Sequence, residues 1–262
     1  MAKILDDGPL IDCGNGFHSV RGTFRAGGVL DVGTQCALVE LEPGRFVFLD
    51  SYTLPDGVLD EVMRMTDGGA RVEAVLNLHP FHTLHCAWMH RAFPRAKMFG
   101  TQRHKDKLPK LPWQETRCED EALAERYGEW FDFSVPQGTA LICDSETVHF
   151  ASVLALHRAS GVVHVDDTLT WLEKGFPLSL LPMTGRLMFH PTLDKALEER
   201  AGAADAFIAW AKELASGWAE TQVLACAHNA VVKMEPGEFE RLVGEALERV
   251  MPGLEKHRAR WG

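Results

Sequence analysis

The order of apolar patterns along the chain is the feature that most limits its fold. Short alternating or apolar runs, separated by glycine- or proline-containing turns, predict a β-meander over residues 17–50 and a second β-rich block over residues 130–172. Each block is followed, in order, by a helical pattern, a strand-like run and a further helical pattern. This order predicts two similar α/β halves.

Local signals give these elements approximate limits. Asp56 is the expected cap of the first helix, and the glycine pair at 68–69 is its expected stop. In the first half we expect helix 59–65, strand 72–78, helix 86–93, strand 96–100 and a variable loop at 101–118. In the second half we expect hairpin strands 152–156 and 162–165, helix 193–214, strand 221–226 and helix 238–251.

Three histidines, each three residues from the next, make residues 78–85 (L-H-P-F-H-T-L-H) the segment richest in potential metal ligands. The segment lies at a predicted strand-to-helix corner, which can aim several imidazoles at one point, and imidazole is the commonest protein ligand of borderline transition metals. A metal site is therefore one interpretation. The other is that His79, His82 and His85 form a stripe on one helical turn, facing water or the core.

Composition and charge restrict the class of protein. The chain has 262 residues, of which 46% are hydrophobic, so it can bury a large core. Its formal charge of -10, without a long basic cluster, argues against a nucleic-acid partner. The sequence has no secretion-signal layout and no apolar run of membrane-spanning length. Six cysteines without a C-x-x-C pair indicate free thiols in a reducing compartment, so we expect a cytoplasmic protein with no membrane contact.

The order of these motifs is similar to that of the metallo-β-lactamase-fold superfamily. An early meander ends in F-L-D-S with Asp50, the histidine corner follows, and His149 precedes a predicted β-hairpin. Asp167 in D-D-T-L follows that hairpin, and His228 in C-A-H-N follows a late strand. The resemblance covers most of the chain. It implies one domain over residues 1–262, of the α/β class and folded as a four-layer αββα sandwich.

The histidine corner departs from the family's first motif, H-x-H-x-D-H. Aligning the last motif histidine with His85 places the second on His82, but the motif aspartate then falls on Leu84 and the first histidine on Pro80. His79 is one residue out of register, so a bulge is needed to bring it into the site. In dinuclear members the motif aspartate binds the second metal and helps to orient the metal-bound hydroxide, and a leucine can do neither.

The resemblance implies a site for one or two divalent ions, with zinc expected and iron as the alternative. One set of ligands would combine His82, His149 and Asp167, and a second, weaker set would combine His85, Asp167 and His228. The expected metal ligands are His79, His82, His85, His149, Asp167 and His228, and the expected catalytic residues are Asp167 and His85. Taken singly, the histidine before the hairpin, the aspartate after it and the late histidine could each serve only local structure.

Three functions fit this pattern. The first is a metal-dependent hydrolase, in which the ion activates water and polarises the carbonyl of an ester, thioester, amide or lactone. The second is a mononuclear non-haem iron oxygenase, because two histidines and one carboxylate also bind Fe(II). The third is a non-catalytic descendant that binds a ligand, an interpretation favoured by Leu84. For the enzymes we expect a small-molecule substrate, and composition gives no signature of an oligomer interface.

Several other side chains are expected to serve structure. His157 and His164 flank the hairpin turn, and we expect both to face solvent. No motif surrounds four further histidines, His18, His104, His190 and His257. The basic stretch from Arg103 to Lys110 could overhang the site and attract an anion, although a solvated loop is the commoner explanation. Trp113, in the same loop, is the best candidate for a wall of the site.

Overall fold

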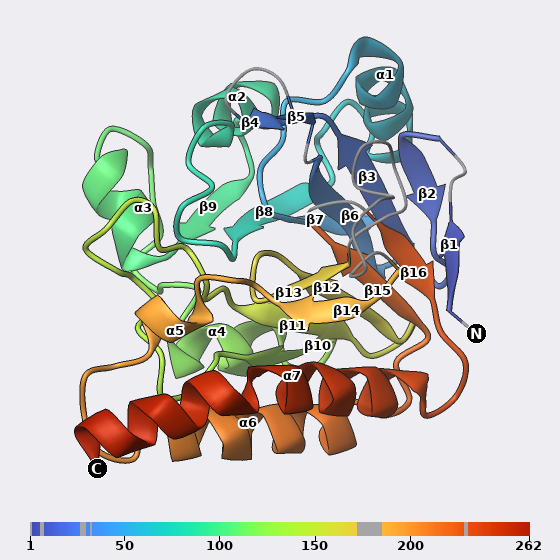
Figure 1. Cartoon of the computed structure of the whole chain (residues 1–262). Coiled ribbons are helices and arrows are strands. Elements are labelled where there is room, and N and C mark those ends of the chain that lie inside the picture. The colour runs from blue at the N-terminus through green and yellow to red at the C-terminus, as the bar shows by residue number, and fades with distance from the viewer. Residues whose placement is uncertain (1, 6–7, 27–29, 32, 172–184, 228–229) are drawn as a thin grey trace.

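Two six-stranded β-sheets face each other in the computed structural model, which describes residues 2–5, 8–26, 30–31, 33–171, 185–227 and 230–262 (Figure 1). The first sheet contains, in spatial order, β2 (Leu10–Asp12), β3 (Phe17–Gly22), β6 (Thr34–Glu42), β7 (Arg45–Leu49), β8 (Val72–Asn77) and β9 (Lys97–Gly100). The second contains β1 (Lys3–Leu5), β16 (Val231–Lys233), β15 (Val223–Cys226), β12 (Val162–Val165), β11 (Leu154–His157) and β10 (Phe131–Ser134). Two short pairs join β4 (Arg25–Ala26) to β5 (Leu30–Asp31) and β13 (Leu169–Trp171) to β14 (Leu187–Phe189).

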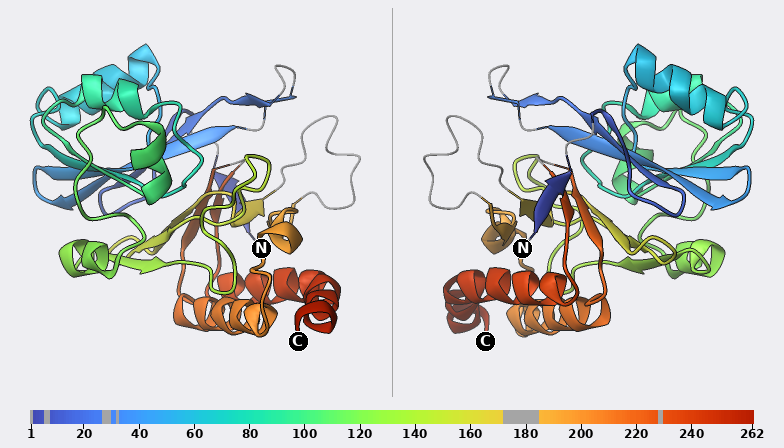
Figure 2. Two further views of the ribbon diagram at one scale, coloured as in Figure 1. Left: turned by 90° about the vertical axis from the view of Figure 1, so that its left-hand side faces the viewer. Right: turned by 90° about the vertical axis from the view of Figure 1, so that its right-hand side faces the viewer.

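The described residues form seven helices, and the largest of them cover the outer faces of the two sheets. The seven helices are α1 (Asp56–Met65), α2 (Cys86–Ala92), α3 (Gln102–Lys107), α4 (Glu121–Tyr127), α5 (Leu193–Ala196), α6 (Ala203–Gly217) and α7 (Glu238–Trp261). In Figure 1, α1 and α2 lie above the first sheet, and α6 and α7 lie side by side below the second. The two side views of Figure 2 show the same separation of the helices to opposite ends of the molecule. Among the described residues, no helix combines the length and the apolar character needed to cross a membrane.

Three apolar layers hold these elements together. Side chains of α1 and α2, such as Val62 and Met89, pack with Val75 of the first sheet. A second layer fills the space between the sheets, and a third joins the second sheet to α6 and α7. Burial of apolar area contributes about 25 cal/mol per Å². The order helix, sheet, sheet, helix confirms the predicted αββα sandwich.

Parallel strand pairs set the position of the site. β7, β8 and β9 pair in parallel, and β12 pairs in parallel with β15. These strands are covered on both faces, which explains their continuous apolar sequences. Parallel strands also end at one edge of a sheet, so residues that follow β7 and β8 lie close together.

Three of the predicted elements differ from the structure. The helix expected over residues 193–214 is divided into α5 and α6, because Leu197 leaves the helical conformation after α5 (ψ 133°) and Gly202 adopts the left-handed region (φ 76°) immediately before α6. The last helix does not stop at Met251 but continues through Pro252 to Trp261, and Leu254 beyond the proline is fully buried. The loop expected at 101–118 contains α3, whose first turn is closed by a capping box.

Candidate metal centre

The centre lies where β8 and β12 end. His79 follows β8 by two residues, and Asp167 follows β12 by two residues. The segment from His79 to His85 is a series of turns, so the interpretation as a stripe on a helix is wrong. His79 and Asp167 are almost completely buried, with exposed fractions of 0% and 1%. Two strands from different sheets therefore bring a histidine and a carboxylate together inside the protein.

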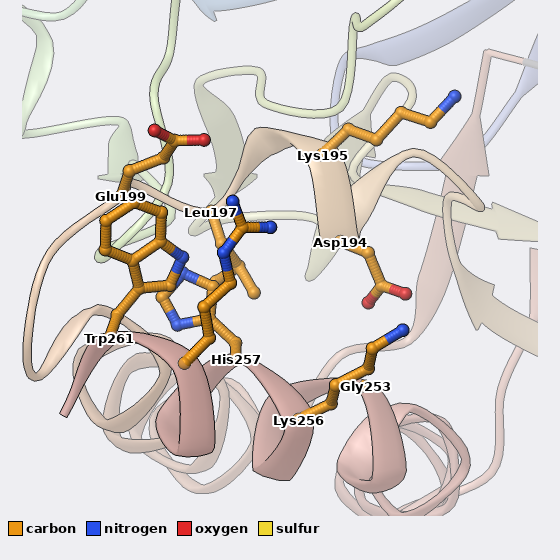
Figure 3. Close-up of a pocket in the computed structure, with 9 residues that line it drawn as sticks. Asp194, Lys195, Leu197, Glu199, Gly253, Lys256, His257 and Trp261 are labelled. Carbon is orange, nitrogen blue, oxygen red and sulfur yellow. The ribbon is translucent and has the colours of Figure 1, made fainter.

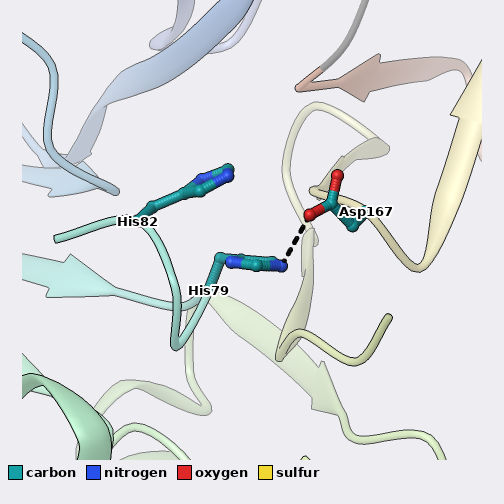
Figure 4. A group of neighbouring side chains, drawn as sticks. All are labelled: His79, His82 and Asp167. Carbon is teal, nitrogen blue, oxygen red and sulfur yellow. Dashed lines mark ion pairs between the residues drawn. The ribbon is translucent and has the colours of Figure 1, made fainter. Parts of the chain in front are cut away.

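Asp167 is the common partner of two predicted ligands. Its Oδ2 lies 3.0 Å from Nε2 of His79 (Figure 4). The same oxygen lies 2.7 Å from Nδ1 of His149. Figure 4 also shows the ring of His82 directed toward the same carboxylate. His79, His82 and Asp167 offer ligand atoms that lie within 4.8 Å of one another. The turn after β8 therefore brings His79 and His82 to one carboxylate.

His82 is held by a second aspartate. Its Nδ1 lies 3.0 Å from Oδ2 of Asp166, which is buried next to Asp167. Burial opposes the charge of the imidazole, but the carboxylates of Asp166 and Asp167 outweigh it and raise the pKa of His82 to about 9. Burial likewise opposes the charge of Asp166, but His82 outweighs it and lowers the pKa of that carboxyl. The buried Asp166 and the partly exposed His82 therefore form an ion pair beside the centre.

His190 belongs to the centre, although the sequence analysis assigned it to structure. It directly follows β14, and its ring centroid lies 5.0 Å from that of His149. His149, Asp167 and His190 also offer ligand atoms within 4.8 Å of one another. The signal in the sequence was the position of His190 at the end of a strand, which it shares with His79 and Asp167.

A third group of potential ligands is completely buried and lies next to the centre. Asp50, His164 and Asp166 offer ligand atoms within 4.8 Å of one another. Oδ2 of Asp50 lies 2.9 Å from Nε2 of His164, and Oδ1 accepts the backbone N–H of Leu78 at 2.7 Å and that of His79 at 3.3 Å. Burial and the neighbouring Asp166 raise the pKa of Asp50, against the opposing effect of His164. This group ties the end of β7 to the turn that carries His79.

The expectation that His157 and His164 face solvent is wrong. Both have exposed fractions of 1%. His164 lies on β12, a central strand whose two faces are covered, and it meets Asp50 between the sheets. His157 packs between the rings of Phe17 and Phe131.

His85 lies beside the centre, outside its ligand groups. Nδ1 of His85 lies 2.8 Å from Oγ1 of Thr53, and its ring meets the edge of Tyr52. Burial lowers the pKa of His85, and the nearby charge of His82 lowers it further. Among the described residues, His85 is in none of the three ligand groups. His228, the expected ligand after β15, lies outside the described residues.

A pocket of about 250 Å³ opens onto the centre. Its lining includes His82, His149 and Asp167, and also Leu84, whose side chain is 72% exposed. The residue that stands in the place of the motif aspartate therefore faces the pocket but offers no donor atom. Other residues that line the pocket are Phe24, Thr34, Ser51, Phe81, Thr83 and His85.

The basic stretch after the histidine corner reaches the rim of this pocket at one point. The guanidinium of Arg103 lies 4.1 Å from the ring centroid of Phe81, and its charge is paired with Glu146, as is that of Lys107. Trp113 is not part of the pocket. It packs against His104 in the layer above the first sheet, so the prediction of a wall formed by Trp113 is wrong.

A separate pocket of about 380 Å³ lies between α5 and the end of α7 (Figure 3). Its side chains carry mixed charges, including Lys195, Lys256 and Arg260 opposite Asp194 and Glu199. No member of the three ligand groups lines it, so it is distinct from the centre.

The donor set fits a divalent metal. Imidazole nitrogens and a carboxylate oxygen are ligands of zinc at about 2.0–2.2 Å, which places the ligand atoms of a tetrahedral ion roughly 3.4 Å apart. The contacts of 2.7 and 3.0 Å around Asp167 would have to widen by less than about 1 Å to reach this separation. Among the described residues, His79, His82, His149, Asp167 and His190 could hold one or two ions.

Comparison with known proteins gives matches in structure only. No family model and no curated protein matches the sequence. A metallo-β-lactamase from Erythrobacter litoralis, with β-mercaptoethanol in its active site, is 11% identical with a TM-score of 0.60, over 94% of this chain and 100% of that chain. The enzyme FIM-1 from Pseudomonas aeruginosa, in its mono-zinc form, is 11% identical with a TM-score of 0.56, over 93% and 97% of the two chains.

A metallo-β-lactamase from Hirschia baltica is 12% identical, with a TM-score of 0.54 over 91% of this chain and 96% of that chain. The matches span nearly the whole of each chain, and they agree with the order of layers observed here. The protein therefore has the metallo-β-lactamase fold.

Proposed function

We propose that the protein is a metal-dependent hydrolase that uses a metal-activated water to cleave a small ester, thioester, amide or lactone. The observation that carries this proposal is the grouping of His79, His82 and His149 around the buried carboxylate of Asp167, at the base of a pocket open to a small molecule. The fold shared with metallo-β-lactamases supports the same reaction class.

Zinc is the ion we expect at this centre. When bound, it would lower the pKa of a coordinated water to roughly 7 and polarise the substrate carbonyl. Asp167 would contribute the negative charge that balances the cation, and His79 and His149 would hold it through neutral nitrogens. Asp166 would fix the ring of His82 through Nδ1, as carboxylates commonly do for metal-site histidines.

Two observations favour alternatives. His79, His82 and Asp167 form a two-histidine, one-carboxylate group, which also suits Fe(II) in a mononuclear oxygenase. The exposed Leu84 in the pocket favours a descendant that binds a ligand without hydrolysis. For the location of the protein we propose a reducing compartment such as the cytoplasm, because all six cysteines are free thiols and four are buried.

Elemental analysis of untagged protein, dialysed without chelator, tests the proposal. Wild-type protein is expected to carry zinc, and a His82→Ala, His149→Ala double variant is expected to lose it. A matched His18→Ala, His257→Ala variant removes two histidines outside the ligand groups and should retain the metal. Hydrolysis of an ester, thioester and lactone panel should then disappear with chelator and return with zinc.

The other outcomes distinguish the alternatives. Iron together with oxygen consumption would replace the hydrolase with an oxygenase. A folded protein that takes up no zinc, manganese or iron would rule out both enzymes and leave ligand binding.

A further inference from the structure

Two pairs of histidines lie around the single carboxylate of Asp167. His79 and His82 form one ligand group with it, and His149 and His190 form the other. A carboxylate has two oxygens, so it can bridge two cations, and in two-metal hydrolytic sites the ions are about 3.5–4 Å apart. The arrangement is one that two adjacent ions could share.

A hydroxyl group helps to fix the ring of His190. Its Nδ1 lies 2.8 Å from Oγ1 of Thr192. A histidine that binds a metal commonly donates its other N–H to an oxygen that fixes the ring. The backbone N–H of Thr192 also approaches Nδ1, at 3.3 Å, and favours the opposite tautomer. The shorter contact with the hydroxyl is the one that metal binding would retain.

The sequence explains why a second metal position would need ligands other than the motif aspartate. The motif aspartate that binds a second metal in the resembled family is Leu84 here, and this side chain is largely exposed and apolar. His190 comes instead from the strand β14, on a different part of the chain. We propose that His149, Asp167 and His190 form a second metal position, which replaces the one that Leu84 removes and shares Asp167 with His79 and His82.

This proposal rests on the proposed function, because both use the same centre. The number of metal ions bound per chain tests it. The full chain is stripped with chelator and titrated with Zn²⁺ and Co²⁺ by calorimetry and equilibrium dialysis. Wild-type protein should bind two ions, and His190→Ala and His190→Gln should each bind one. His257→Ala, as a matched control, should still bind two.

The spectrum of Co²⁺ and one further variant add readouts that do not depend on activity. His190→Ala should lose the visible absorption of one cobalt while keeping that of the other. Thr192→Val should keep two positions but weaken one of them by roughly 10- to 100-fold, the usual effect of losing a group that orients a metal ligand. Circular dichroism establishes that each variant is folded.

The failures are distinguishable. A wild-type protein that binds one ion, or a folded His190→Ala protein that still binds two, would overturn the second position and leave the proposed hydrolase intact. A folded wild-type protein that binds no ion would overturn both.

Discussion

The carboxylate of Asp167 is almost completely buried at the edge of the pocket. The two imidazoles that touch it are its near partners, and a cation between them would satisfy all three groups at once. At the scale of single residues, we therefore expect the affinity of the centre for a metal ion to depend on this carboxylate more than on any one histidine.

Replacing Asp167 by asparagine tests this dependence. The variant keeps the shape of the side chain but removes its charge, so we expect the affinity for Zn²⁺ to fall by at least about 10-fold, with activity lost in parallel. Chelator-competition titrations measure the affinity, and circular dichroism checks the fold. Asp132→Asn, at an exposed ion pair with Arg158, is the control and should bind zinc as the wild type does. Equal affinities in the two variants would remove Asp167 from the centre.

The sequence predicted some residues of the centre and not others, for physical reasons. His149 and Asp167 were singled out by the order of the motifs, and the structure brings these two side chains together. The burial of His164 was not predicted, because a central strand with a parallel neighbour is buried on both faces, so alternation along it carries no information about exposure. His190 was missed because its neighbours in space come from distant parts of the chain.

At the scale of elements, Asp50 connects the strands that carry the centre. It receives the backbone of the turn after β8 and the ring of His164 from β12, while itself following β7. Three strand ends therefore depend on one buried side chain.

Asp50→Ala should consequently be strongly destabilising. It leaves His164 without its buried acceptor and frees two backbone N–H groups, so we expect the free energy of unfolding to fall by about 3–5 kcal/mol. Urea denaturation at pH 7.5 measures the loss. Asp132→Ala, which breaks an exposed ion pair, should cost less than about 1 kcal/mol. A similarly small decrease in the free energy of unfolding for Asp50→Ala would show that the contacts of Asp50 are not needed for stability.

His157 on β11 makes stability depend on pH. Burial lowers the pKa of His157 to about 4 from 6.5. The unfolded chain binds a proton at this residue below about pH 6.5 and the folded chain does so only near pH 4, so its contribution is complete above 6.5 and is lost as the pH falls between these values. Between pH 7 and pH 5, the free energy of unfolding of His157→Gln should therefore fall by about 2 kcal/mol less than that of the wild type. Urea denaturation of both proteins at both pH values measures these changes. An equal change in wild type and variant would contradict this assignment.

At the scale of the whole molecule, the centre lies between the two sheets. His79 and His82 follow a strand of the first sheet, whereas His149 and Asp167 flank strands of the second. This large-scale arrangement was the most predictable part of the structure, because the order of strands and helices limits the layers they can form. Helix ends were less predictable, since one glycine divided α5 from α6 and tertiary packing carried α7 past its proline.

A bound ion should therefore cross-link the two halves and stabilise the entire fold. At a free zinc concentration 100 times its dissociation constant, binding contributes about 2.7 kcal/mol. For a chain of this size we expect the melting temperature to rise by roughly 5–10 °C. Scanning calorimetry with zinc and with chelator measures the difference, and the His82→Ala, His149→Ala variant should show none. A wild-type transition that zinc does not move would contradict this cross-link.

The pairing of β1 with β16 has a consequence for the order in which the protein can be completed during synthesis. Lys3 lies opposite Lys233, and β16 in turn pairs with β15. As the chain leaves the ribosome, β1 has no native partner until nearly all of the second half has been made, and the first sheet can form long before then. The strand that is synthesised first is therefore among the last to find its place, at the edge of the second sheet.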